Sequence, residues 1–182
     1  LNSKRKGDNR QMMELKGVDE LNEVFEQFFV ELGYPEIECD IDTDFAYYYG
    51  TDEITYSLFS MEEADEGFMR YVNLNYPQMP SCSLFVLSLL HELGHHITMP
   101  MFNKKDYKKW EIEKAKIENI KANTPKEKIE KQIAYCGLFE EKIATAEAVK
   151  ILTVNYEYIH NFEKVWQKAV KRFYKKNNVK NA

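Results

Sequence analysis

The pattern of hydrophobic and polar positions changes character along the first half of the chain. Residues 18–32 carry apolar side chains at helical spacing, which predicts an amphipathic helix. Residues 36–60 instead alternate and are rich in Ile, Phe and Tyr around a Gly-Thr-Asp turn, which predicts two or three short antiparallel strands with one hairpin. Residues 62–67 indicate an acidic loop, and the alternation in "FMRYVNLN" at 68–75 predicts one more strand.

A nearly continuous apolar segment follows at residues 84–97, "LFVLSLLHELGHHI". It is hydrophobic almost all round, so we predict a helix buried in the core. Ser81 or Ser83 can cap its start. Pro100 disfavours helical backbone at the residue before it, so the helix is expected to end there.

The rest of the chain has helical patterns with many charges. Residues 104–123 predict a charged helix with an inner stripe of Tyr107, Trp110, Ile117 and Ile120. "TPKE" at 124–127 combines a cap, a first-turn proline and a capping-box glutamate, and the helix that it starts is expected to run past Ala148. Residues 158–174 predict a last amphipathic helix.

This order of elements predicts an α+β fold. We expect a small, mostly antiparallel sheet packed on the helix at 84–97, with a helical C-terminal half. A length of 182 residues with 44% hydrophobic residues suits one core, so residues 11–182 are expected to form a single domain. The polar residues 1–10 are expected to be disordered.

Charge and cysteine content limit the partners and the cellular location that we expect for the protein. Residues 1–100 carry 6 Lys and Arg against 19 Asp and Glu, and residues 101–182 carry 19 against 11. Two solvated faces account for this asymmetry, and the basic C-terminal end lacks the features of a nucleic-acid module, so nucleic acid is an unlikely partner. Three dispersed cysteines and no long apolar run favour reduced thiols, no membrane and a cytoplasmic location.

The candidate chemistry lies in "HELGH", His91 to His95. Residues four apart on a helix lie one turn apart on the same side, so His91 and His95 can hold one tetrahedral Zn²⁺. Glu92 points about a quarter-turn away. It is therefore placed to act as general base on a water that the metal activates. Gly94 weakens a helix by roughly 1 kcal/mol relative to Ala, which suggests that something approaches it closely.

A third metal ligand has to come from elsewhere in the chain. The extended pattern HExxHxxGxxH fails, because Thr98 and Met101 stand at its glycine and last histidine positions. "FEEKIATAEA" is the best source, since small residues one turn after Glu141 would let that helix approach the two histidines. The alternatives are Glu140, Glu147, Glu157 and His160.

These motifs resemble the zincin metallopeptidases of the gluzincin kind, and most of all the minimal ImmA/IrrE-type domains. The matching pieces are "YVNLN", "FVLSLLHELGHHI" and "EEKIATAEAV". The resemblance implies a zincin-like fold and places the third zinc ligand on Glu141. It also implies that Thr145 stands where related patterns often have Asp or Asn, which orient a histidine.

The resemblance further implies hydrolysis of peptide bonds in a protein or peptide substrate, for instance a regulator. An edge strand can hold such a peptide, and residues 68–75 are the candidate. His96 is not expected to bind the metal. By residue type alone, Tyr156, Tyr158 and His160 are candidates to stabilise the transition state. The alternative function is a non-catalytic binding or regulatory module with a structural metal. The oligomeric state is left open.

Overall fold

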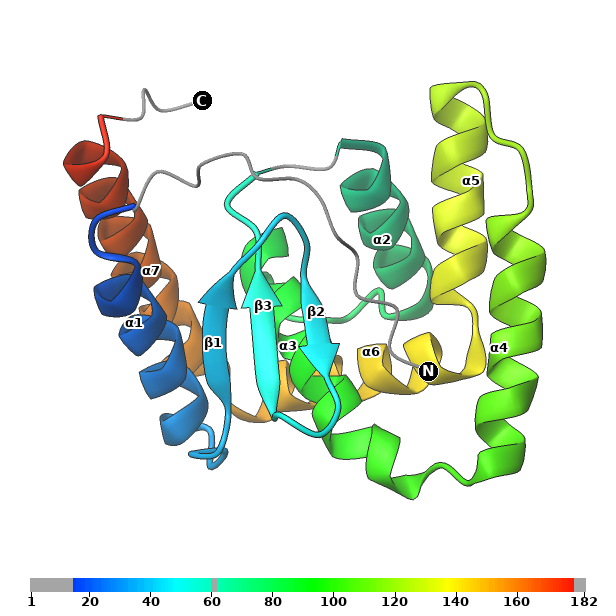
Figure 1. Cartoon of the computed structure of the whole chain (residues 1–182), viewed down its shortest axis with the longest axis horizontal. Helices are drawn as coiled ribbons and strands as arrows, with labels where there is room; N and C mark the ends of the chain where they lie inside the picture. The colour runs from blue at the N-terminus through cyan, green and yellow to red at the C-terminus, as the bar shows by residue number, and fades with distance from the viewer. Residues whose placement is uncertain (1–14, 60–61, 179–182) are drawn as a thin grey trace, which may run out of the picture.

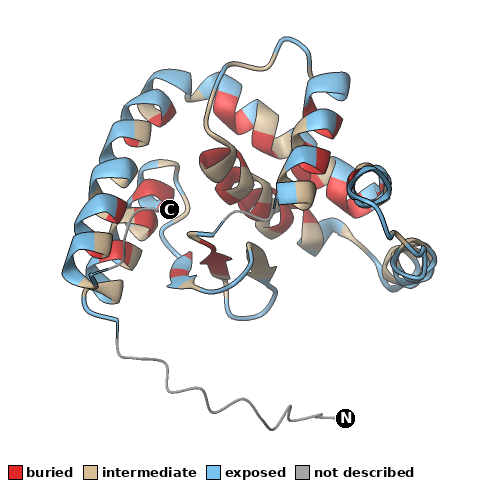
Figure 2. Cartoon of the chain, turned by 90° about the horizontal axis from the view of Figure 1, so that it is seen from above, coloured by how far each residue is buried: buried red, intermediate tan, exposed pale blue. Residues whose placement is uncertain are grey.

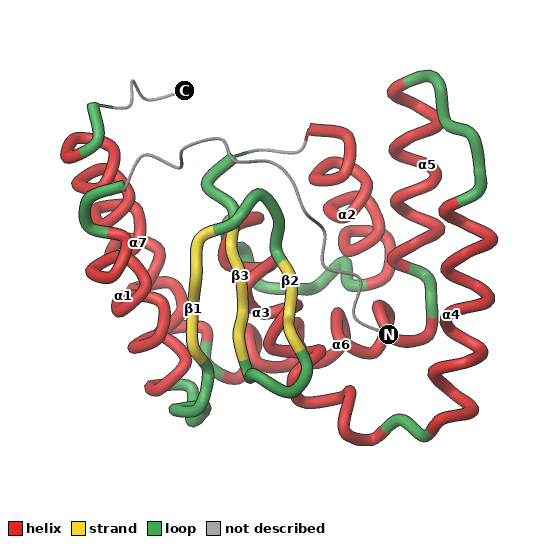
Figure 3. Tube along the Cα trace, in the orientation of Figure 1, coloured by secondary structure: helices red, strands yellow, loops and turns green. Residues whose placement is uncertain are grey.

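The computed structural model describes residues 15–59 and 62–178 and shows an α+β fold (Figure 1, Figure 3). One helix precedes a three-stranded sheet, and six α-helices and one short 3-10 helix, η1 (Met99–Met101), follow it among the described residues. The first part consists of α1 (Val18–Glu31), β1 (Glu38–Ile41), β2 (Ala46–Tyr48) and β3 (Glu53–Tyr56). The helices after the sheet are α2 (Glu62–Asn75), α3 (Leu84–Thr98), α4 (Lys104–Glu118), α5 (Pro125–Cys136), α6 (Phe139–Val154) and α7 (Tyr156–Lys176). The expected disorder of residues 1–10 lies outside the described residues.

The sheet is mixed, with strand order β1-β3-β2. β2 and β3 form the predicted antiparallel hairpin, whose turn contains Gly50 at φ 100° and Asp52 at φ 52°. β1 pairs with β3 in parallel, from Glu38 opposite Glu53. The prediction of a mostly antiparallel sheet is therefore wrong for one of its two strand pairs. β2 is an edge strand, since it pairs only with β3 among the described residues.

The strand predicted at residues 68–75 is wrong, because these residues belong to α2. Their alternation is short enough to fit a helix as well, and the buried positions Phe68, Tyr71 and Val72 follow helical spacing. Leu74, which a strand would place on the same face as Phe68 and Val72, is 74% exposed. The expected acidic loop at 62–67 is the start of the same helix, where carboxylates favour the positive end of the helix dipole.

α3 begins and ends where the sequence predicted, but the backbone of Met99 is still helical and a short 3-10 helix continues through Pro100. Ser83 caps α3 by accepting a hydrogen bond from the backbone N–H of Val86, and the helix ends at Thr98. The sheet lies across one side of α3, with α1 and α7 at one end of the molecule and α2, α4 and α5 at the other (Figure 1). Buried residues gather on the inward faces of these helices (Figure 2). The largest core cluster joins α1, the sheet, α3, α6 and α7 around Phe25, Phe28 and Leu90.

The predicted continuous helix from Thr124 past Ala148 is in fact two helices. α5 has the predicted capping box of Thr124 and Glu127 and ends at Gly137, and Leu138 adopts an extended conformation before α6 begins. This break changes the direction of the chain, so that α6 can pack along α3. α4 keeps no fully buried residue, and Ile120 lies beyond its end and is 49% exposed. The inner stripe predicted there is wrong for that residue.

The composition predicted reduced cysteines and no membrane-spanning segment. Cys39, Cys82 and Cys136 are free thiols, with Cys39 and Cys136 buried and Cys82 partly buried. Among the described residues, none of the helices combines the length and apolar character that crossing a bilayer requires.

Candidate metal centre

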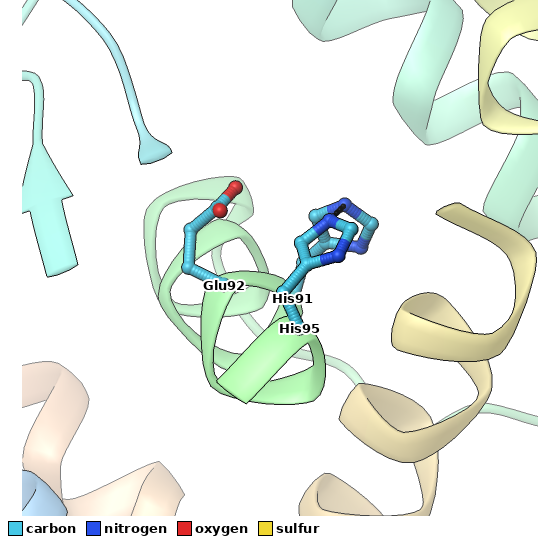
Figure 4. Close-up of side chains that lie close together, drawn as sticks. All are labelled: His91, Glu92 and His95. Carbon is cyan, nitrogen blue, oxygen red and sulfur yellow. Dashed lines mark hydrogen bonds between the residues drawn. The ribbon is translucent and has the colours of Figure 1, made fainter. Parts of the chain in front are cut away.

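α3 brings His91, Glu92 and His95 together at the centre of the molecule. One potential ligand atom from each of these residues lies within 4.8 Å of the other two, a grouping that could hold a metal ion. The two imidazole rings stand beside each other, whereas the carboxylate of Glu92 points to a different side of the helix (Figure 4). This arrangement follows from the helix itself, since residues four apart share a side and the next residue is rotated by about 100°.

Glu141 of α6 reaches the same point from outside α3. Its Oε2 lies 3.1 Å from Nε2 of His91 and 3.4 Å from Nε2 of His95, and the two Nε2 atoms are 3.1 Å apart. Ligand atoms about 2.0–2.1 Å from a tetrahedral metal are separated by about 3.3–3.4 Å from one another. The spacing of these three atoms therefore fits a tetrahedral ion.

Thr145, one turn after Glu141, orients His91. Its hydroxyl donates to the backbone carbonyl of Glu141 at 2.8 Å, so its oxygen can accept from Nδ1–H of His91 at 3.1 Å. A proton on Nδ1 leaves the lone pair of Nε2 directed at Glu141 and His95. When His95 is also neutral and protonated on Nδ1, three acceptor atoms converge on one point, which a metal ion between them would satisfy. In the metal-free centre, protonated imidazoles donate to Glu141 instead.

The other histidine has a carboxylate on its outer side. Nδ1 of His95 is buried without a hydrogen-bond partner, and Oε1 of Glu140 lies 3.7 Å from it. Glu140 is itself buried. Sequence reasoning left Glu140 as an alternative ligand, but the structure places it behind His95, on the side away from Glu141.

The protonation states of these groups depend strongly on one another. Burial by itself would raise the pKa of Glu141, but hydrogen bonds from His91 and His95 lower it well below its ordinary value. Burial would lower the pKa of His95, yet Glu141, Glu92 and Glu140 together raise it to about 9. Burial raises the pKa of Glu92, with the two histidines acting in the opposite direction. The centre is thus strongly acidic and attracts positive charge.

A close crossing of α3 and α6 brings these residues together. A Cβ atom added to Gly94 would lie 2.2 Å from the backbone oxygen of Ala144 and 2.9 Å from its Cα. No larger residue fits at position 94 without moving one helix. The close approach inferred from Gly94 is confirmed, and the neighbour is the backbone of α6.

The centre opens into a cleft of about 500 Å³. One wall is β2 with the residues before it, and the others come from α2, α4 and α5. Trp110 and Lys114 of α4 and Tyr135 of α5 line it together with the histidines. The Nζ of Lys114 lies 4.6 Å from the ring centre of Trp110 and 5.7 Å from that of Tyr135.

Sequence reasoning missed Tyr135 and Lys114, and took Trp110 only as a core residue. Their only signal was an aromatic or a lysine at an inward position of a charged helix, which many helices share. Burial and the neighbouring Glu141 raise the pKa of the Tyr135 hydroxyl, which therefore keeps its proton. Nε1 of Trp110 is buried and has no hydrogen-bond partner among the described residues.

Other residues considered from the sequence lie outside the cleft. Glu147 pairs with Lys150, Glu157 is exposed at the start of α7, and His160 stacks on Tyr156. Tyr158 packs on Phe28 in the groove between α1 and α7. None of these residues lines the cleft.

His96 points away from the centre, as the sequence predicted. Its Nε2 contacts Oε1 of Glu36 at 3.0 Å, and its Nδ1 lies 3.2 Å from the hydroxyl of Tyr47. It therefore links α3 to the loop before β1 and to β2.

Comparisons with models of known protein families, with curated proteins and with solved structures find no match for this chain.

Proposed function

We propose that this protein is a zinc-dependent peptidase in which His91, His95 and Glu141 bind the metal and Glu92 is the general base. The observation that carries the proposal is the convergence of Nε2 of His91, Nε2 of His95 and Oε2 of Glu141, while the carboxylate of Glu92 stands apart. The resemblance of the "HELGH" segment to zincin peptidases supports the same function.

The donor set favours zinc. Two imidazole nitrogens and one carboxylate oxygen are the ligands of many catalytic zinc sites, which keep a fourth position for water or substrate. When bound, zinc supplies a Lewis acid that polarises a carbonyl group and brings the pKa of a water molecule to about 7. A structural site would instead close with four protein ligands.

The residues of this chain then divide the remaining work. Glu92 takes the proton of the attacking water on its carboxylate and later passes it to the nitrogen of the leaving amine. Its raised pKa suits a group that must both accept and release a proton. Thr145 holds His91 through Nδ1, and Glu140 stands behind His95.

The cleft supports a peptide as substrate. β2 is an edge strand, and its residues Ala46 and Tyr47 line the cleft. The backbone of Tyr47 bonds to the Glu92 carboxylate, and the other backbone groups on the unpaired side of β2 can pair with an extended peptide, the role that sequence reasoning gave to residues 68–75. The protonated Tyr135 hydroxyl lines the cleft beside Glu141, and its role in this proposal is to donate to the oxygen that becomes negative in the transition state.

Metal analysis combined with cleavage of a proteome-derived peptide library tests the proposal. We expect about one zinc per chain and cleavage that falls by about 10²–10⁴-fold in Glu92→Gln, which keeps its zinc. Glu147→Gln, a change of the same kind outside the cleft, serves as the matched control and should cleave normally.

Two results would contradict the proposal. One is a zinc-free protein that takes up no zinc, and the other is equal cleavage by wild type and Glu92→Gln. If the zinc-loaded wild type cuts nothing but binds a partner equally well with either residue at position 92, the protein is a non-catalytic binding module.

A further inference from the structure

α1 and α7 lie at the opposite end of the molecule from α4 and α5 (Figure 1). A second cavity lies between α1 and α7. It is a groove of about 750 Å³. Its apolar surface consists of Val24, Phe28, Val30, Tyr158, Phe162 and Val165. Val30 is 42% exposed and Val165 is 51% exposed, so part of this apolar surface faces solvent. We call it the α1–α7 groove.

One side of the α1–α7 groove is acidic. Glu20, Glu23 and Glu31 line it from α1, and Gln27 lies between them at the same helical spacing. Glu26 also lines the groove, and none of the lining residues is Lys or Arg. Glu20 pairs with Lys176, whereas Glu23 has no ion-pair partner among the described residues. The α7 side offers the neutral Asn161 and the apolar Val165.

The two sides of the groove are helices, whose backbone groups already bond within each helix. The groove therefore offers no row of backbone donors and acceptors to an extended peptide, and such a peptide would lose hydrogen bonds to water without replacement. A helix satisfies its own backbone and needs only an apolar stripe to fill the groove. Opposite the glutamates of α1, the matching charge on that helix is positive.

We propose that the α1–α7 groove binds an amphipathic helix of a partner protein that carries basic residues along one flank of its apolar stripe. α1 has 14 residues and spans about 21 Å, so the bound helix needs about four turns. Its basic residues should repeat every three or four positions, because Glu20, Glu23 and Glu31 lie along one stripe of α1. This inference does not depend on the proposed peptidase activity.

Three synthetic helical peptides test the proposal on the full chain. They share one leucine stripe and differ only in one flank, which carries Lys and Arg, Gln, or Glu. Fluorescence anisotropy should show that the basic peptide binds at least about tenfold more tightly than the acidic one at low salt. The difference should shrink at about 0.5 M salt, where charges are screened over a few ångströms.

Two variants of the groove and two matched controls locate the binding. Glu23→Lys combined with Glu31→Lys should weaken binding of the basic peptide and strengthen binding of the acidic one. Val165→Asp should reduce binding of all three peptides, because it puts a charge on the apolar surface. Ile112→Asp on α4 changes a residue of similar exposure (50%) and should have no effect, and neither should Glu111→Lys.

Several outcomes would overturn the proposal. These are no binding of any peptide, equal binding of the basic and acidic peptides, and Val165→Asp behaving like Ile112→Asp. If the wild type sediments as a dimer and Val165→Asp sediments as a monomer, a second copy of this chain fills the groove. If a chain that begins at Leu15 binds the basic peptide far more tightly than the full chain, residues 1–14 occupy the groove. Either result excludes a separate partner as the occupant.

Discussion

At the crossing of α3 and α6, polar side chains are buried, whereas between α1 and α7 apolar side chains are exposed. Glu92, Glu140 and Glu141 are all less than 10% exposed, although isolated buried carboxylates are very unfavourable. Val30 and Val165, in the α1–α7 groove, are exposed by 42% and 51%. Polar side chains are usually exposed and apolar ones buried. The first region breaks the first half of this rule, and the second region breaks the other half.

The type of side chain found in an unusual environment indicates the type of ligand that the region binds. Buried acceptors that converge on one point are stabilised by a small cation, because it satisfies several of them at once. Exposed apolar residues beside a row of carboxylates are stabilised by a larger amphipathic surface. The first region should be intolerant of small changes in shape, and the second tolerant of them.

Gly94→Ala tests the rigidity of the first region most directly. Its new methyl group would lie 2.2 Å from the Ala144 oxygen, so α3 and α6 must separate. We expect the free energy of unfolding, measured by urea denaturation, to fall by about 3 kcal/mol or more. Gly137→Ala is the control: its nearest added contact, 3.3 Å from the Ala134 oxygen, is milder. Equal stability of the two variants would mean that the helices do not cross this closely.

Glu141→Ala should weaken zinc binding by at least about 100-fold, the upper end of the range for residues that only support a ligand. Competition with a chromophoric chelator measures the affinity. Glu147→Ala, at a partly exposed position of the same helix outside the cleft, should bind zinc normally. If the two variants retain zinc equally, Glu141 is not a ligand, and the test then moves to Glu157→Ala and His160→Ala.

Removal of the metal should reveal a characteristic pH dependence of stability. The folded pKa of His95, about 9, lies above its ordinary value of 6.5. The stability that the ionised His95 contributes to the folded protein is therefore fully present below about pH 6.5 and is lost as the pH rises through about 9. The lowered pKa of Glu141 gives the opposite dependence, with stability present above about pH 4.5 and lost as the pH falls towards the folded value.

The metal-free protein should thus be most stable near about pH 5–6 and lose on the order of 2 kcal/mol by about pH 9.5. Urea titrations across this range measure the loss, and His95→Gln should flatten it. With zinc present, the free energy of unfolding should instead decrease as the pH becomes acidic, because protons compete with the metal for the histidines. A metal-free protein that becomes more stable between pH 6.5 and 9 would contradict the assignment.

Thr145→Val should have a smaller effect than loss of a ligand. It keeps the shape of the side chain but removes the oxygen that accepts from Nδ1 of His91. Zinc affinity should fall by about 10–100-fold, with little change in the far-UV circular dichroism. Thr145→Ser restores the oxygen and should recover most of the affinity. If Thr145→Ser binds zinc as weakly as Thr145→Val, the hydroxyl does not orient His91.

The smallest effect is expected in the α1–α7 groove. Val165→Ala should change the free energy of unfolding by less than about 0.5 kcal/mol, because half of the side chain already faces solvent. Val86→Ala makes the same chemical change at a residue that is 0% exposed and should lower stability by about 1.5–3 kcal/mol. A large loss in Val165→Ala would mean that the groove is part of the core rather than a docking surface.

Sequence alone determined the features that depend on neighbours along the chain. The spacing of His91 and His95 on one turn and the sideways position of Glu92 follow from helix geometry. The caps at Ser83 and Thr124 follow from side chains that reach backbone groups three residues away. These are short-range effects, so they could be predicted before the fold was known.

The tertiary structure decided everything that joins distant segments. Residues 68–75 fit a strand or a helix locally, and only packing of Phe68, Tyr71 and Val72 selected the helix. Glu141 could not be distinguished from Glu157 by spacing, because its approach to His91 depends on the break after α5 and on the contact of Gly94 with Ala144. The packing of α4 and α5 against the rest of the chain likewise places Lys114 and Tyr135 in the cleft. Such contacts depend on how whole helices pack, which no local pattern specifies.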